Sequence, residues 1–376
     1  MMDEDTKAKS ADDADALIDD ETDAEESIPL TAYEVSFYAL DYLVDGIVQR
    51  LGSDDILILQ VGTDLQDGEY VIPGFQRPFV WSTQKSDKFI ESLLMGLPVP
   101  GIFLARTSEG VLLVLDGQQR LETLRKFYTG NRKLGNSVQQ MYRQKTYNTL
   151  ADEDRRRLDN SVIHATVVRQ ESPGDYDSIY HIFERLNSGG EELTPQQIRM
   201  ALYHGTFSEL LLELNQNGTW RKLIRQKTSD LAFKKFKDIE MILRFFALFH
   251  DSGEYKNPMK NFLNKFMAKH RNIESSERKQ YEQLFCDTVK FINQSMGDSA
   301  FCGKGKRPSA AIVDSLMYGV AKRLISGVSL SSQEAQNAVE AMLEDQDYQE
   351  AIGKRTSMVK HVKQRLNLSE QAFCRQ

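Results

Sequence analysis

The chain has 376 residues, of which 40% are hydrophobic and 27% are charged, and its formal net charge is −8. This composition is typical of a soluble globular protein with a substantial core, and the length suits two or three domains, or one large core with a helical appendage. No apolar run approaches the ~18 residues that a membrane-spanning helix needs. The acidic N-terminus is not that of a signal or transit peptide. We therefore expect a cytoplasmic protein with no membrane partner.

The negative charge is concentrated at the N-terminus. Residues 1–27 hold twelve acidic residues against Lys7 and Lys9, so the other 349 residues carry a net charge of about +2. A segment with so many charges and so few apolar residues cannot bury enough surface to offset the entropy of ordering it. We predict a disordered acidic tail over 1–27, which either solubilises the chain or competes with nucleic acid for a basic surface. The nearly neutral body leaves nucleotides and DNA open as partners.

Strand and helix patterns alternate after the tail. They predict strands at 35–38, 55–61, 102–105, 111–115 and 162–168, and helices at 41–51, 82–95 and 118–128. Asp41 is the expected N-cap of the first helix and Ser82 that of the second. The strands on either side of the turn at 108–110 should form a hairpin. The polar residues 129–160 are expected to form an insertion over the surface.

A wholly helical region follows. Thr194 and Pro195 predict a helix start, with threonine as the cap and proline at the first position. Helical patterns cover 177–186, 207–214, 236–250, 258–270, 275–294, 308–325, 332–343 and 354–367. The predicted fold class is α+β from residue 28 to about 200, followed by an all-α domain.

One strand end carries more polar residues than packing requires. An apolar strand leads into Asp116, Gly117, Gln118, Gln119 and Arg120, and an amphipathic helix follows. The start of a helix presents unpaired N–H groups and favours anions. Arg120 could neutralise charge on a phosphate, a glutamine could position an attacking water, and Asp116 could hold Mg²⁺ or accept a proton. The structural alternative is a tight turn with Asp116 as the N-cap and Arg120 on the surface.

Two other loops carry polar residues that could join this site. Gln76 and Arg77 lie between two prolines, which exclude a helix and a central strand. An arginine in a rigid loop suits a phosphate or a base, although stacking of Arg77 on Trp81 explains it equally well. Asn187 and the glycines that follow it form either a backbone nest for a phosphate or a helix C-cap. No G-x-x-x-x-G-K-[ST] sequence occurs, so nucleotide hydrolysis would not use a Walker-type loop.

Three segments in this order resemble the N-terminal (S-type) domain of GmrSD-type, modification-dependent restriction systems, a family related to ParB and sulfiredoxin folds. They are IPGFQRPFVW, VLDGQQRLETL and IFERLNSGGEELTPQQIR. The resemblance runs from about residue 35 to 204, and the helical region through about 325 resembles the family's C-terminal extension. It implies a small mixed sheet with surrounding helices, hence a ParB-like nucleotide-binding domain over 28–204 and a helical domain over 205–376.

The resemblance also implies a site, because the Asp-Gly-Gln-Gln-Arg segment of the family is tied to nucleoside triphosphate hydrolysis. The implied catalytic residues are Asp116, Gln118, Gln119 and Arg120, with Asp116 as the ligand of Mg²⁺. The implied nucleotide-binding residues are Gln76, Arg77, Gly117 and Asn187. We expect the guanidinium groups of Arg77 and Arg120 to face one cavity beside the start of the 118–128 helix.

The resemblance implies a nucleoside triphosphate-binding and hydrolysing subunit of a DNA restriction or phage-defence system, which regulates DNA recognition or cleavage. Complete systems of this family contain a histidine–asparagine–histidine nuclease, and the sequence shows no such module. A separate nuclease subunit is therefore an expected partner, beside DNA, and nuclease activity of this chain alone is not expected. Two alternatives stay open: a DNA-binding adaptor or clamp that uses nucleotide as a switch without turnover, and a ParB-like nuclease. The helical region could also pack on itself in a homo-oligomer.

Overall fold

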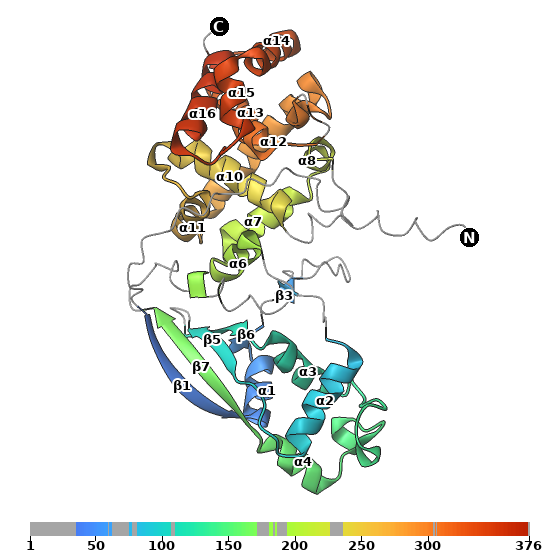
Figure 1. Cartoon of the computed structure of the whole chain (residues 1–376). Coiled ribbons are helices and arrows are strands. Elements are labelled where there is room, and N and C mark those ends of the chain that lie inside the picture. The colour runs from blue at the N-terminus through green and yellow to red at the C-terminus, as the bar shows by residue number, and fades with distance from the viewer. Residues whose placement is uncertain are drawn as a thin grey trace, which may run out of the picture. The chain divides into compact units, whose positions relative to one another are not determined.

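The structure is a computed structural model. It describes residues 35–58, 60–61, 75–76, 81–106, 110–170, 180–182, 185, 194–225, 236–303, 305 and 307–374. The chain divides into two compact units, one formed by Ala32–Leu193 and one that contains Thr194–Gln376. The first is α+β and the described residues of the second are helical (Figure 1), which confirms the predicted fold class. The relation to ParB and sulfiredoxin folds stays a prediction, and the acidic tail lies outside the described residues.

A five-stranded mixed sheet organises the α+β unit, in the order β1–β7–β5–β6–β2. Its strands are β1 (Val35–Leu43), β2 (Ile56–Leu57), β5 (Ile102–Arg106), β6 (Leu112–Asp116) and β7 (Val162–Gln170). β7 is antiparallel to β1 and parallel to β5, while β6 is antiparallel to β5 and parallel to β2. The β5–β6 pair confirms the predicted hairpin. A separate two-stranded sheet joins β3 (Gln60–Val61) to β4 (Phe75–Gln76).

Helices cover one face of this sheet and enclose the core of the unit (Figure 1). They are α1 (Val44–Gly52), α2 (Thr83–Leu94), α3 (Gln118–Tyr128) and α4 (Asp152–Asp159). α2 begins as predicted, because the Ser82 hydroxyl accepts a hydrogen bond from the Lys85 N–H at 3.2 Å. α3 has the predicted bounds, and its apolar residues Leu121, Leu124 and Phe127 are fully buried. This packing fixes the start of α3 relative to the end of β6.

The start of the unit differs from the prediction. Asp41 does not cap a helix, because β1 continues to Leu43, and α1 begins after it. Asp41 lies opposite His164 of β7, and its Oδ1 is 2.6 Å from the His164 Nδ1. Pairing with β7 along all of β1 outweighs the local capping signal. The strand predicted at 55–61 is divided, since β2 pairs with β6 whereas β3 pairs with β4.

Residues 129–160 are not the predicted surface insertion. Five of their apolar side chains belong to the core, although Met141 is 60% exposed: Leu134, Val138, Tyr142, Leu150 and Leu158. Asp87 of α2, whose side chain is buried, accepts hydrogen bonds from Arg132 Nη2 at 2.8 Å and from the Gly135 N–H at 2.9 Å. A buried carboxylate that receives several donors anchors this polar segment to α2. The high polarity of the segment as a whole led to the wrong prediction, because its packing depends on only a few apolar side chains.

The second unit is built from packed helices. They are α6 (Pro195–Leu202), α7 (Thr206–Asn215), α8 (Gly218–Leu223), α10 (Lys237–Asp251), α11 (Met259–Lys269), α12 (Ser275–Met296), α13 (Ala310–Ile325), α14 (Ser332–Glu344), α15 (Gln346–Gly353) and α16 (Val359–Cys374). Thr194 caps α6, as predicted, and Gln197 completes a capping box with it. The helix predicted at 354–367 starts later, at Val359. Among the described residues, no helix has the length and apolar character that crossing a membrane requires.

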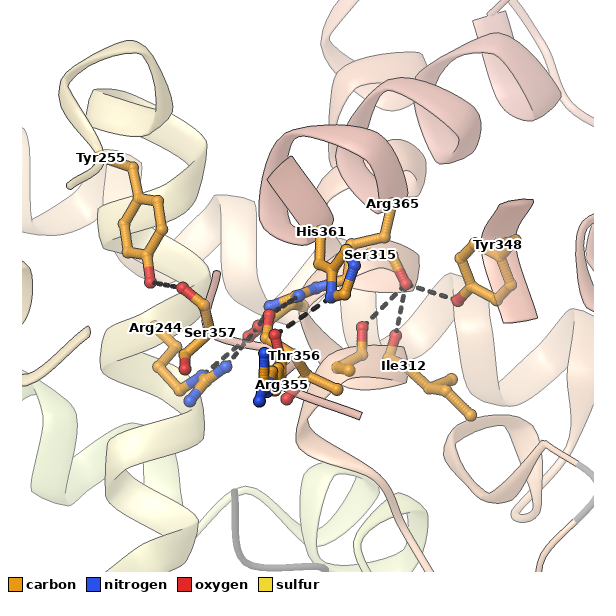
Figure 2. A network of polar contacts seen from close by, with 12 residues as sticks. Arg244, Tyr255, Ile312, Ser315, Tyr348, Arg355, Thr356, Ser357, His361 and Arg365 are labelled. Atoms are coloured by element: carbon orange, nitrogen blue, oxygen red, sulfur yellow. Dashed lines mark hydrogen bonds and ion pairs between the residues drawn. The ribbon is translucent and has the colours of Figure 1, made fainter. Parts of the chain in front are cut away.

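A buried ion network joins three helices of this unit (Figure 2). Asp314 of α13 accepts hydrogen bonds from Arg244 of α10 at 3.1 and 2.7 Å, and from Arg365 of α16 at 2.7 Å. Arg365 also donates to the Thr356 carbonyl. Burial by itself would raise the pKa of Asp314, but the two guanidinium groups outweigh it and hold that pKa below its usual range. The network ties the C-terminal helix to the centre of the unit.

Candidate functional site

The turn between β6 and α3 requires glycine at position 117. Gly117 has a φ of +99°, in the region that favours glycine, and a Cβ there would lie 2.4 Å from the Ile102 Cγ2. Gly117 is also the N-cap residue of α3, and no side chain caps this end. The first backbone hydrogen bond of α3 runs from the Leu121 N–H to the Gly117 carbonyl, at 3.0 Å. The N–H groups of the first turn therefore retain their capacity to bind an anion.

Arg120 is held firmly beside this turn. Its Nη2 donates to the Gly101 carbonyl at 3.0 Å and to the Asp116 Oδ2 at 2.7 Å. The Arg120 side chain is 13% exposed, whereas that of Asp116 is 47% exposed. The Arg120 Nε is buried, and in the part of the chain that the structure describes it has no hydrogen-bond partner. The alternative of Asp116 as N-cap and Arg120 on the surface is therefore wrong.

The two glutamines of the turn have different environments. Gln118 is buried, and its Oε1 has no hydrogen-bond partner among the described residues. The Gln119 Oε1 accepts a hydrogen bond from the Trp81 N–H at 3.2 Å. Gln119 therefore connects the start of α3 to Trp81, which precedes the Ser82 cap of α2. Gln118 holds a buried acceptor that a ligand or a water molecule could satisfy.

The other predicted nucleotide-binding residues lie largely outside the residues that the structure describes. Gln76 lies in β4 and pairs with Gln60 of β3, but its side chain is not described. Arg77 and Asn187 lie outside the described residues. The structure thus places the five residues from Asp116 to Arg120 at one turn between β6 and α3. The meeting of Arg77 and Arg120 in one cavity stays a prediction.

The chemistry of the turn suits an anion with a divalent cation. The uncapped end of α3 carries partial positive charge, and the Arg120 guanidinium adds a full one. Mg²⁺ commonly binds through one or two carboxylates together with substrate phosphates. Asp116 fits this role, because its carboxylate is half exposed and only Oδ2 is engaged by Arg120 within the described residues. Neither at this turn nor at any other place in the described residues do three or more His, Cys, Asp or Glu side chains gather in a group that could hold a metal ion.

Two residues beside the turn were not predicted as part of the site. Gly101 supplies the carbonyl that receives Arg120, and a Cβ on it would lie 2.7 Å from the His164 carbonyl oxygen. The only sequence signal was a glycine just before a strand, which often marks a close backbone approach. Trp81 was expected only as a stacking partner of Arg77. Its backbone contact with Gln119 leaves no trace in the sequence.

The comparisons with known proteins agree with the motifs. Residues 60–204 match the family model described as GmrSD restriction endonuclease, N-terminal domain. No curated protein and no solved structure matches the chain. The matched range contains the whole turn from Asp116 to Arg120 and the capped start of α6.

Proposed function

Because residues 60–204 are a domain of the GmrSD N-terminal family, we propose that this chain is a nucleoside triphosphate-binding and hydrolysing subunit of a DNA restriction or phage-defence system. In that role it regulates DNA recognition or cleavage, and a separate histidine–asparagine–histidine nuclease subunit is its expected partner. The observation that carries the proposal is the pair of unsatisfied polar atoms at the uncapped start of α3, Gln118 Oε1 and Arg120 Nε. An unpaired buried polar atom costs roughly 1–3 kcal/mol. Two of them beside an anion-favouring helix end support a ligand site here.

Each residue of the turn has a separate role in the proposed phosphoryl transfer. Arg120 and the N–H groups of α3 stabilise negative charge that develops on the phosphates. Gln118 orients the attacking water through its free acceptor. Asp116 would hold Mg²⁺ together with the substrate phosphates, and the ion would supply positive charge beside them. We propose Gln76, Arg77 and Asn187 as further phosphate contacts.

The Arg120→Ala variant tests the proposal. We expect phosphate release from wild type with at least one of ATP, GTP, CTP or UTP and Mg²⁺, and a fall in kcat of about 100- to 1000-fold in the variant, because a charge-stabilising donor is lost. Arg125→Ala is the matched control, since Arg125 lies on the same helix and pairs with Glu122 at 2.7 Å. Equal rates for wild type and Arg120→Ala would remove the catalytic assignment.

The two glutamines should separate in kinetic behaviour. In Gln118→Ala we expect kcat to fall by about 100-fold with little change in KM, since general catalysis by a positioned side chain contributes at least that much. In Gln119→Ala we expect a loss of about 1 kcal/mol in unfolding free energy from the missing Trp81 hydrogen bond, with a smaller kinetic effect. Steady-state kinetics and urea unfolding of both variants measure this. The reverse pattern would exchange the two roles.

A second candidate function follows from the ion pair in the turn. Asp116 lies 2.7 Å from the Arg120 guanidinium and offsets part of its charge, which would weaken the stabilisation of developing negative charge that turnover requires. The chain would then be a DNA-binding adaptor or clamp that uses nucleotide as a switch. Tight nucleotide binding without phosphate release, together with salt-dependent DNA binding, would favour this role. Plasmid cleavage by the pure protein with Mg²⁺ would instead favour a ParB-like nuclease.

A further inference from the structure

β1 forms an edge of the five-stranded sheet (Figure 1). Among the described residues it pairs with β7 and with no other strand. Its nine residues, VSFYALDYL, follow the β7 register without a bulge, and they include neither proline nor lysine. Soluble proteins usually protect a long edge strand with a bulge, a proline or a charged residue such as lysine, because unpaired backbone groups can pair with a strand of another chain. The one charged side chain of β1 is that of Asp41, whose Oδ1 lies 2.6 Å from the His164 Nδ1 of β7.

Large apolar side chains accompany the free backbone edge. Phe37 is 76% exposed and Leu43 is 46% exposed, and both lie on one face of β1. Leu40, on the opposite face, is 37% exposed. Exposed apolar side chains on both faces of an edge strand favour a partner that continues the sheet, because only a strand covers both faces at once.

The sequence of β1 is complementary to itself in one antiparallel register. With a two-fold axis at Leu40, Phe37 of each copy lies opposite Leu43 of the other, and the two Leu40 residues lie opposite each other. Aromatic and aliphatic cross-strand pairs stabilise a sheet. An axis at Asp41 would instead place two carboxylates directly opposite, which is unfavourable. An axis at Ala39 would place Phe37 opposite Asp41.

We propose that a second copy of this chain pairs with β1 in that register. The two sheets then form one continuous ten-stranded sheet across an isologous interface, with the same residues contributed by both copies. The pairing satisfies the free backbone edge and covers Phe37, Leu40 and Leu43 together. It is independent of nucleotide binding, so it stands or falls separately from the proposed function.

Cysteine cross-linking tests the register in the full chain. Leu40→Cys should give a disulfide-linked dimer under mild oxidation, because Leu40 lies on the axis. Phe37→Cys and Leu43→Cys should each give no dimer alone, but should cross-link when the two proteins are mixed. Wild type controls for the native cysteines, Cys286, Cys302 and Cys374. A dimer from Leu43→Cys alone, or none from the mixture, would overturn the register.

Mass measurement in solution tests the interface itself. We expect wild type to be a dimer at micromolar concentration by light scattering, and Phe37→Lys to shift it to monomer with an unchanged circular dichroism spectrum. Val162→Lys is the matched control, because Val162 is 43% exposed but lies on β7, away from the free edge. It should remain dimeric. A monomeric wild type, or a dimer that survives Phe37→Lys, would overturn the proposal.

Discussion

Replacing Gly117 with alanine is expected to destabilise the α+β unit by about 2–5 kcal/mol. The left-handed backbone conformation costs an alanine roughly 1–2 kcal/mol, and forcing a methyl group into packed atoms adds about 1–3 kcal/mol. Both penalties apply here, because φ is +99° and the new Cβ would lie 2.4 Å from the Ile102 Cγ2. The structure must relieve the clash by moving the start of α3. Urea unfolding followed by circular dichroism measures the loss, and we expect nucleotide turnover to fall with it.

Gly110→Ala separates the two penalties. Gly110 has a similar φ of +89°, but no atom of the described residues lies within 4 Å of the position that its Cβ would take. It should therefore lose only the backbone contribution, roughly 1–2 kcal/mol. If both variants lost the same amount, the contact with Ile102 would not constrain the turn. The loss of stability in Gly117→Ala would then come from the backbone conformation alone.

Replacing Asp314 with alanine is expected to destabilise the helical unit by about 3–5 kcal/mol, the usual result of removing one member of a buried ion pair. The variant leaves two buried guanidinium groups, those of Arg244 and Arg365, without their shared counterion. Thermal and urea unfolding measure the loss. Asp347→Ala is the control, because Asp347 is exposed, and it should change the stability by less than about 0.5 kcal/mol. A loss below 1 kcal/mol in the Asp314 variant would contradict the network.

The same network sets a direction for acid sensitivity. The folded-state pKa of Asp314 is depressed by Arg244 and Arg365, so its contribution is fully present above the unfolded-state pKa of about 3.9. It is lost as the pH falls through the lower folded-state value. The stability difference between wild type and Asp314→Asn should therefore persist down to about pH 4 and diminish only in stronger acid.

Local signals predicted the elements that local forces determine. The bounds of α3, the cap at Ser82, the capping box at Thr194 and the β5–β6 hairpin all depend on residues close together in the chain. The extension of β1 to Leu43 depends instead on β7, and no local signal reports it. The buried network is similar, since Asp314 is 70 residues from Arg244 and 51 from Arg365.

The candidate site shows the same division. The polar turn from Asp116 to Arg120 stood out in the sequence, because packing does not require such residues after a buried strand. The different roles of Gln118 and Gln119 could not be predicted, since they depend on where Trp81 lies. The hydrogen bond from Arg120 to the Gly101 carbonyl could not be predicted either, because a backbone acceptor has no signature in a sequence.

The pairing of β1 with β7 also constrains the order in which the chain can fold. Asp41 and His164, which face each other across the two strands, are 123 residues apart. During synthesis β1 emerges early, and β7, its partner strand among the described residues, is made much later. Pairings between distant segments form slowly and leave strands exposed in the meantime. A nascent or truncated chain that ends before Val162 therefore presents a nine-residue apolar strand with two open edges, which is a template for aggregation.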